Sequence, residues 1–154
     1  MTKEHHVDAF VQATIECFES MVDLVPERKE TRTQIPPIEN SDVCAIIGLS
    51  GDSAGMVTIS FSSDVAKVVV GNFLGEDPAD LGDEDLYDAV GELINIIAGN
   101  GKAYVKDAAL SISLPSVMHG DKYYMSLPKS ASVTSVDFDL PGVGLMTMML
   151  SLVD

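Results

Sequence analysis

The segment from about Asp83 to Lys106 constrains the fold most, because its apolar residues recur with the period of an α-helix. Gly99-Asn100-Gly101 lies inside the pattern, and the good helix formers that follow favour a helix that continues through it. A helix with one apolar face must pack against other elements, so the chain has to supply an apolar layer for it. At about 100° per residue, the apolar side chains form one wide stripe: Leu86, Val90, Leu93, Ile94 and Ile97.

The opposite side of this helix carries Asp88, Glu92, Asn95 and Gly99. Asn is a poor choice for a helix face that only meets water, because its amide competes for backbone hydrogen bonds. Glu92 and Asn95 are three positions apart, so their side chains are neighbours and can act on one target. A carboxylate beside an amide can hold a cation and orient a water molecule. The residues alone leave two interpretations open: a working face of this kind, or a solvated face with an incidental Asn.

The rest of the chain alternates between helical and strand patterns. Apolar residues recur at helical spacing from about His5 to Leu24 before Pro26, and Ser62 or Ser63 is placed to cap a second helix from about 64 to 74. Residues 31–38, with two prolines, predict an irregular or edge segment. Strands joined by short turns favour an antiparallel sheet with helices packed on it, so residues 1–154 predict a single α+β domain. The strands are expected at residues 43–49, 56–61, 111–114, 122–127, 133–138 and 143–152, with a hairpin turn at 50–55.

The charge balance excludes several classes of partner. Twenty-four acidic residues against nine basic ones give a formal net charge of −15. Nucleic acid and acidic membrane surfaces are therefore poor ligands for this chain. Part of the charge lies between Glu76 and Asp85, just before the long helix, where it suits the positive end of the helix dipole. This cluster is either a solvated cap or a surface that attracts a lysine of a partner.

Two further features bear on location and assembly. The N-terminus lacks the composition of a targeting segment, and the strongest apolar run, Val143 to Val153, is too short to cross a bilayer. Cys17 and Cys44 fall in a helix pattern and a strand pattern, which favours buried, reduced thiols. We therefore expect a cytoplasmic protein. The run from Val143 also places apolar side chains on both faces of one strand, which predicts cover on both sides or an interface.

The helix motif Asp88-x-x-x-Glu92-x-x-Asn95 runs on to Asn100 and is followed by Ile112-Ser-Leu-Pro115 and the residues to Gly120. Together with the segments 55–62 and 66–75, these motifs resemble the CheC/CheX/FliY phosphatase family of bacterial chemotaxis. CheX is the closest branch, because it keeps one active helix where CheC usually has two. The resemblance implies a CheC-like α+β fold, and it implies a homodimer because CheX-like proteins pair through their sheets.

The resemblance also implies an activity. Family members hydrolyse the phospho-aspartate of the response regulator CheY. The residue that matches Asn95 orients the attacking water, and the one that matches Glu92 grips the regulator. Asp88 is expected to support the motif, and Pro115 matches the family's downstream proline, although its offset of 20 positions from Asn95 is slightly short of the usual interval. The regulator brings its own Asp and Mg²⁺, so we expect neither a cofactor nor a metal ligand in this chain.

Two other functions remain open at this point. One is a module that binds a response regulator without hydrolysing its phosphate. The other is a structural component of the flagellar-switch type, which shares the fold.

A second segment repeats the outline of the helix motif. Asp8-Ala-Phe-Val-Gln12-Ala-Thr-Ile15 stands 80 positions earlier, with Gln12 in the place of Glu92 and Ile15 in the place of Asn95. Either both helices descend from a duplicated unit, of which the first has lost its charge and amide, or the agreement is chance. The family resemblance favours duplication, and with it a pseudo-two-fold repeat.

The histidines add no second site. His5 and His6 are adjacent, so they lack the spacing of a metal pair on a helix. His119 is expected in a turn close to the motif, as a surface residue without a nucleophile beside it.

Overall fold

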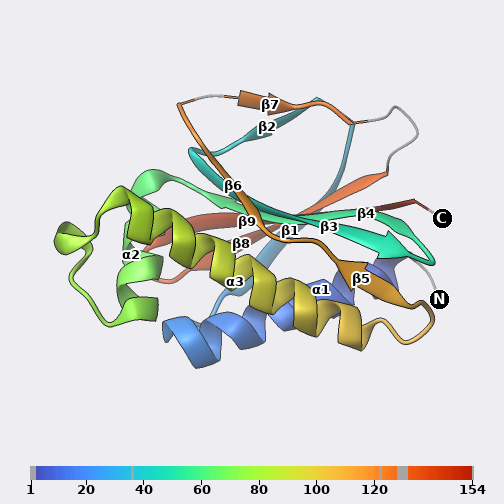
Figure 1. The fold of residues 1–154 in the computed structure, drawn as a ribbon, viewed down its shortest axis with the longest axis horizontal. Coiled ribbons are helices and arrows are strands. Elements are labelled where there is room, and N and C mark those ends of the chain that lie inside the picture. The colour runs from blue at the N-terminus through green and yellow to red at the C-terminus, as the bar shows by residue number, and fades with distance from the viewer. Residues whose placement is uncertain (1–2, 36, 122, 128–131, 154) are drawn as a thin grey trace.

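The structure, a computed structural model, describes residues 3–35, 37–121, 123–127 and 132–153 in three layers (Figure 1). A seven-stranded sheet forms the middle layer, two long helices lie side by side against one face, and a two-stranded sheet lies over the other face. The α+β class expected from the sequence is confirmed. The elements in chain order are α1 (Lys3–Cys17), the π-helical turn η1 (Phe18–Val22), β1 (Glu27–Gln34), β2 (Ile38–Asn40), β3 (Val43–Gly51), β4 (Ala54–Phe61), α2 (Ser63–Leu74), the 3-10 turn η2 (Pro78–Asp80), α3 (Asp83–Tyr104), β5 (Leu110–Ile112), β6 (Ser116–His119), β7 (Tyr123–Met125), β8 (Val133–Leu140) and β9 (Gly144–Val153).

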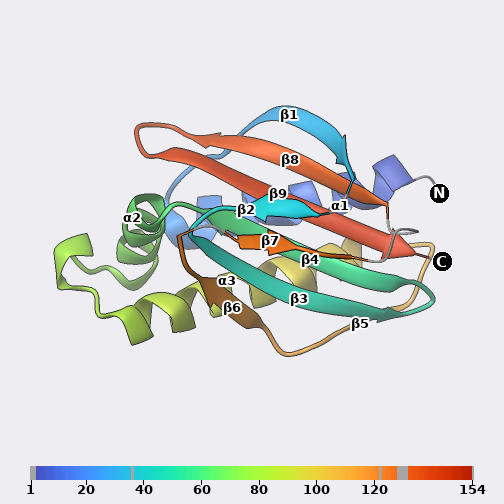
Figure 2. The ribbon, with the colours of Figure 1, turned by 90° about the horizontal axis from the view of Figure 1, so that it is seen from above.

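The strand pairing has the symmetry of a duplicated unit. The large sheet is antiparallel in the order β1-β8-β9-β4-β3-β5, and β6 also pairs with β3. The hairpins β3–β4 and β8–β9 meet at the centre through β4 and β9, and their outer strands β3 and β8 pair with β6 and β1 respectively. β2 pairs with β7, and α1 packs against α3. The two halves of the fold are thus related by one pseudo-two-fold axis. In Figure 2 the pairs β2–β7, β4–β9 and α1–α3 lie one behind another.

The long helix α3 continues through Gly99 and Gly101, as expected. Its apolar stripe is fully or almost fully buried against α1 and the sheet. A Cβ on Gly101 would lie 2.2 Å from Cδ1 of Phe10, whose ring is fully buried between the helices. Glycine therefore lets α1 approach the backbone of α3 at this point, and this contact fixes how the two helices sit together.

The expectations for the cap of α2 and for the two cysteines are confirmed. Ser62 caps α2, and its Oγ accepts a hydrogen bond from the backbone N–H of Val65 at 3.2 Å. Cys17 and Cys44 are buried free thiols, as predicted. Burial raises the pKa of both thiols to about 11, because the thiolate form loses its hydration.

Several strands differ from the sequence expectation. β1 begins at Glu27 instead of residue 31, because an edge strand that is exposed along most of its length shows no alternation of apolar residues. β2 begins at Ile38, the last residue of the segment expected to be irregular or at an edge, and β6 ends at His119, for which the sequence predicts a turn. Both are short and owe their form to pairing with distant strands. β5 ends at Ile112, two residues before the predicted end, and Lys122 of the predicted strand 122–127 lies outside the described residues.

The second face of β9 is largely covered from within the chain. Met149 is buried in a small cluster with Ile38 of β2 and Val133 of β8, whereas Leu145 is 66% exposed. The apolar character of both faces of this strand therefore no longer supports an interface, and the homodimer stays a prediction. Among the described residues, no helix has the length and apolar character needed to span a membrane.

Candidate functional site

The polar stripe of α3 borders a groove on the surface. Asp88, Glu92 and Asn95 are exposed, while the apolar stripe on the other side of the same helix is in the core. The helix is thus held rigidly by its buried face, and its polar face is free. The groove has a volume of about 530 Å³, and its wall opposite the helix comes from the segment that joins β5 to β6. The lining residues are Tyr87, Asp88, Gly91, Glu92, Asn95, Leu114, Pro115 and Val117.

Gly91 determines how close this segment comes to α3. A Cβ at this position would lie 3.4 Å from Cγ2 of Val117 and 3.8 Å from Cβ of Pro115. Because Gly91 has no side chain, Pro115 can lie against α3 at this point, which falls between Asp88 and Asn95 along the helix. The structure brings all four residues singled out in the sequence, including Pro115, to the same groove. The short offset of Pro115 from Asn95 is no obstacle to this arrangement.

The wall opposite the polar stripe is apolar and open to solvent. Leu114 is 88% exposed, and Pro115 beside it is partly buried. Leu114 and Pro115 thus form an apolar wall that faces carboxylates and an amide across the groove. No local pattern in the sequence marks Leu114 as part of the site, because its exposure depends on the path of the β5–β6 segment.

An aromatic stack lies at the edge of the groove. The rings of Tyr87 and His119 are parallel within 9°, with their centroids 4.1 Å apart. His119 is exposed, as expected, but it is the last residue of β6 and pairs with Val43, so the turn predicted for it is wrong. The stack fixes the position of Tyr87, which lines the groove.

The chemistry available here is that of an acceptor and an amide that have no internal partner. Among the residues that the structure describes, the side chains of Glu92 and Asn95 form no hydrogen bond or ion pair. Both groups are therefore available to an incoming molecule. Within the same described residues, no three His, Cys, Asp or Glu side chains are grouped to hold a metal ion. His6 contacts Asp107 at 3.1 Å instead of pairing with His5.

The corresponding face of α1 is engaged differently. Asp8, the counterpart of Asp88, forms an ion pair with Arg28 of β1 at 3.0 Å. Gln12 donates a hydrogen bond to Glu16 at 3.0 Å, and Glu16 in turn accepts one from the hydroxyl of Tyr104 on α3. A smaller depression of about 230 Å³ lies between α1 and β1. Its position beside α1 corresponds to that of the groove beside α3. The first helix thus keeps the position of a site, and its polar groups bind one another.

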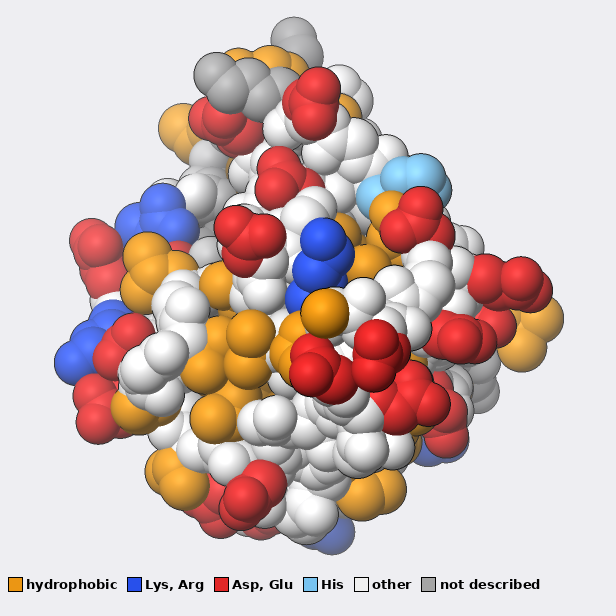
Figure 3. Space-filling model, turned by 90° about the vertical axis from the view of Figure 1, so that its left-hand side faces the viewer, with side chains coloured by type: hydrophobic (Ala, Val, Ile, Leu, Met, Phe, Trp, Pro, Cys, Tyr) orange, Lys and Arg blue, Asp and Glu red, His pale blue; other side chains and the backbone are white. Residues whose placement is uncertain are grey.

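Acidic groups surround the approach to α3. Asp83, Glu84 and Asp85 form its first turn and are exposed. Their position at the helix N-terminus is favourable, because the partial positive charge there stabilises carboxylates. Figure 3 shows acidic side chains gathered on this end of the molecule.

Comparison with known proteins places the chain in a family. The sequence model of the family described as "Chemotaxis phosphatase CheX" matches residues 43–139, more than half of the chain. The chain belongs to this family. The match includes the α3 motif and the whole groove, as well as the β3–β4 hairpin and β8 up to Asp139. A search of curated proteins gives no match.

Solved structures of CheX proteins have the same fold. The chemotaxis protein CheX from Desulfovibrio desulfuricans superposes with a TM-score of 0.87 at 27% identity, over 96% of this chain and 99% of the other. The CheX of a CheX–CheY–BeF3–Mg²⁺ complex from Borrelia burgdorferi has a TM-score of 0.76 at 24% identity, over 97% and 98% of the two chains. Thermotoga maritima FliY shares the fold at 14% identity, with a TM-score of 0.66 over 98% and 90%.

Proposed function

We propose that this CheX-family protein hydrolyses the phospho-aspartate of a CheY-like response regulator, with Glu92 and Asn95 as the acting residues. One observation carries the proposal: both side chains are exposed and unengaged on a helix whose other face is locked in the core. Glu92 can therefore bind a partner and Asn95 can position a water molecule without a conformational change. The acidic polar stripe and the exposed Leu114 opposite it fit a protein substrate better than a small molecule.

The reaction requires little from this chain. A water molecule attacks the phosphorus atom in line with the bond between phosphorus and the aspartate oxygen. That bond breaks, and the products are inorganic phosphate and a free carboxylate. The side-chain oxygen of Asn95 accepts a hydrogen bond from the water and holds its lone pair toward the phosphorus. Glu92 forms a charge-assisted pair with a lysine of the regulator, which fixes the register of the two proteins.

The expected partner follows from chemistry and from a relative. The Borrelia burgdorferi CheX was solved with CheY, BeF3 and Mg²⁺, which supports a CheY-like partner here. The phosphorylated aspartate and its Mg²⁺ belong to the regulator in this proposal. The acidic first turn of α3 would attract a basic surface on that regulator and speed the encounter.

The test measures how long phosphate stays on a purified CheY after brief phosphorylation by a small-molecule donor. Wild-type protein should shorten this lifetime, and Asn95→Ala should lower the rate by about 10²-fold, since misplacing the attacking group costs about this much. Asn100→Ala is the matched control, because it removes an exposed amide from the same helix away from the groove. It should retain full activity.

Binding separates the proposed roles from the alternatives. Asn95→Ala should still bind the Mg²⁺ and beryllofluoride form of CheY, whereas Glu92→Gln should bind it less tightly. If wild type binds that form and leaves the phosphate lifetime unchanged, the protein is a binding module. If Asn95→Ala loses binding together with turnover, its assigned role is wrong.

A homodimer and a cytoplasmic location complete the proposal. The dimer is supported by the resemblance to CheX-like proteins. Light scattering at micromolar concentration should give twice the mass of one chain, and a monomeric mass would refute the dimer.

A further inference from the structure

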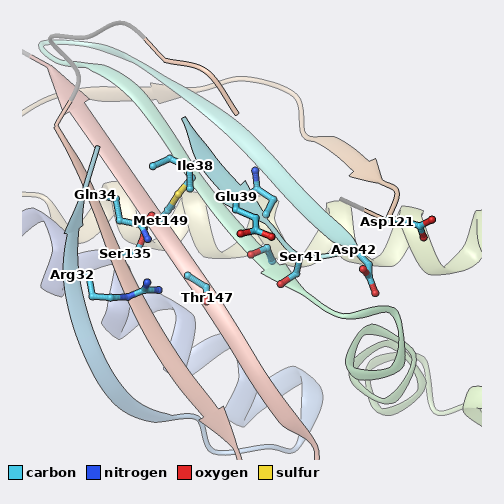
Figure 4. Close-up of a pocket in the computed structure, with 12 residues that line it drawn as sticks. Arg32, Gln34, Ile38, Glu39, Ser41, Asp42, Asp121, Ser135, Thr147 and Met149 are labelled. Atoms are coloured by element: carbon cyan, nitrogen blue, oxygen red, sulfur yellow. Dashed lines mark hydrogen bonds between the residues drawn. The ribbon is translucent and has the colours of Figure 1, made fainter. Parts of the chain in front are cut away.

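A second cavity lies on the other side of the large sheet, away from α1 and α3. It has a volume of about 430 Å³, which is in the range of small-molecule sites. The large sheet forms its floor, and β2 with the turn that follows it forms its cover (Figure 4). Its lining residues are Arg32, Gln34, Ile38, Glu39, Asn40, Ser41, Asp42, Ser60, Asp121, Ser135, Thr147 and Met149.

The floor is polar, and its side chains are ordered by hydrogen bonds. Arg32 of β1 forms an ion pair with Asp137 of β8 through Nη2 at 2.9 Å, and Thr147 donates to the same carboxylate oxygen at 2.9 Å. Ser135 is fully buried and donates to Gln34 at 2.8 Å. These contacts span three adjacent strands, so the floor is a built polar surface and not a set of mobile side chains.

Two buried donors of this cavity are left without an acceptor. Asn40 points inward from β2 and is only 7% exposed, yet its Nδ2 has no hydrogen-bond partner among the described residues. The Nε of Arg32 is likewise buried and unpaired in the described part of the chain. An unsatisfied buried donor costs about 1–3 kcal/mol. Two of them in one cavity favour a ligand that supplies acceptor oxygens.

The two ends of the cavity differ in charge. Figure 4 shows Arg32 and Gln34 at one end and the carboxylates of Asp42 and Asp121 at the other, with Glu39 between them. Arg32 is the only basic residue in the described lining. A ligand whose acceptor oxygens lie on the donors therefore gains further if its far end is positively charged.

We propose that this cavity binds a small zwitterion of the amino acid or short-peptide class. Its acceptor oxygens would accept hydrogen bonds from the Arg32 Nε and the Asn40 Nδ2. Its ammonium group would face Asp121 and Asp42, whose Oδ2 also accepts a hydrogen bond from the backbone N–H of Ser63 at 3.1 Å. The site is separated from the α3 groove by the whole sheet, so both can be occupied at once (Figure 1). It is also independent of the proposed phosphatase activity.

The test is a titration followed by the backbone amide signals in NMR, which detects millimolar binding. L-alanine, L-alanyl-L-alanine and L-alanyl-L-alanyl-L-alanine serve as probes of increasing length. At least one should cause saturable shifts that map to the cavity. Its N-acetyl derivative, which lacks the ammonium group, and its C-terminal amide, which lacks the carboxylate, should each bind about tenfold more weakly or worse.

Two variants and a control test the donors. Arg32→Gln and Asn40→Leu should weaken binding by about tenfold or more, whereas Arg28→Gln should not, because Arg28 lies on the same strand outside the cavity. Asn40→Leu should also leave the ligand-free protein as stable as wild type or more stable, because it removes an unpaired buried donor.

Four results would overturn the proposal. The first is no saturable shift with any of the three probes. The second is equal binding of a probe and its capped derivatives, which would show that charge plays no part. The third is unchanged binding to Asn40→Leu. The fourth is marked destabilisation of the ligand-free Asn40→Leu variant. It would show that the Asn40 amide stabilises the fold through hydrogen bonds to water and does not await a ligand.

Discussion

Two glycines of α3, two positions apart, should respond in opposite ways to the same substitution. Gly99 has nothing within 4 Å of the place where a Cβ would lie. Alanine there gains helix propensity without a clash, which is worth about 1 kcal/mol. We expect Gly99→Ala to raise the free energy of unfolding by about that amount.

Gly101→Ala gains the same propensity and meets an obstacle. Its Cβ would lie 2.2 Å from Cδ1 and 2.5 Å from Cε1 of Phe10, where carbon atoms prefer about 3.5–4 Å. The ring is fully buried, so it can move away only by displacing its neighbours in a close-packed interface. Overpacking of this kind costs about 1–3 kcal/mol and occasionally more. With a clash this severe we expect a net loss of about 2 kcal/mol.

The assay is urea unfolding followed by circular dichroism, with wild type and both alanine variants. The two variants should differ by about 3 kcal/mol in unfolding free energy at an unchanged denaturant slope. In thermal unfolding this corresponds to a separation of about 6–12 °C for a chain of this size. A double variant with Phe10→Leu should recover part of the loss, because the smaller side chain makes room for the new methyl group.

A Gly101→Ala variant that is as stable as Gly99→Ala would contradict this prediction. Such a result would mean that α1 and α3 do not approach as closely as the structure has them. The position of the polar stripe relative to the rest of the fold would then need revision as well.

Three further predictions concern the groove and the buried thiols. Leu114→Ala should weaken binding of the response regulator by about tenfold without loss of stability, since the side chain is 88% exposed. Glu92→Gln should reduce the salt dependence of the same binding, because one charge pair is lost. Cys17 and Cys44 have a pKa of about 11 in the fold, raised from 9.0 by burial. Stability should therefore be complete below pH 9.0 and fall as the pH rises toward 11, by a few kcal/mol in urea titrations.

Each of these predictions has a clear contrary result. Regulator affinity that is unchanged in Leu114→Ala would remove the apolar wall from the docking surface. An identical salt dependence in Glu92→Gln would mean that this carboxylate meets no cation. A double variant with both cysteines changed to alanine should lose most of the alkaline decline, and a decline that persists in full would place its origin elsewhere.

Much of the layout could be predicted from the chain alone. The period of α3, the cap at Ser62 and the hairpin between β3 and β4 are local signals, and the structure has all three. The face of α3 that carries Glu92 and Asn95 also follows from helix geometry, because an angle of about 100° per residue assigns every side chain to a side. The repeat of this outline at Asp8 foretold the two-fold arrangement.

Short strands escaped prediction, because a strand of three or four residues is held by its partner and not by its own preferences. β2 and β6 have no apolar alternation, and β1 is an exposed edge. Of the two possibilities for β9, cover on both sides or an interface, the structure shows cover from within the chain at Met149, since β2 supplies Ile38 against it. Sequence cannot reveal that cover, because it depends on a strand more than 100 positions away.

The sequence by itself determined the polar stripe, because the spacing of residues on a helix requires no knowledge of the rest of the fold. The tertiary structure alone decided what stands opposite that stripe. The close approach of the β5–β6 segment at Gly91 turns an exposed helix face into a groove with an apolar wall. It also decided the second cavity, where β1 and β2 meet side chains of β4, β8 and β9, which are distant from them in the chain. The spacing of residues along a helix decides which way each side chain points, and only the packing of the fold decides which residues lie close to it.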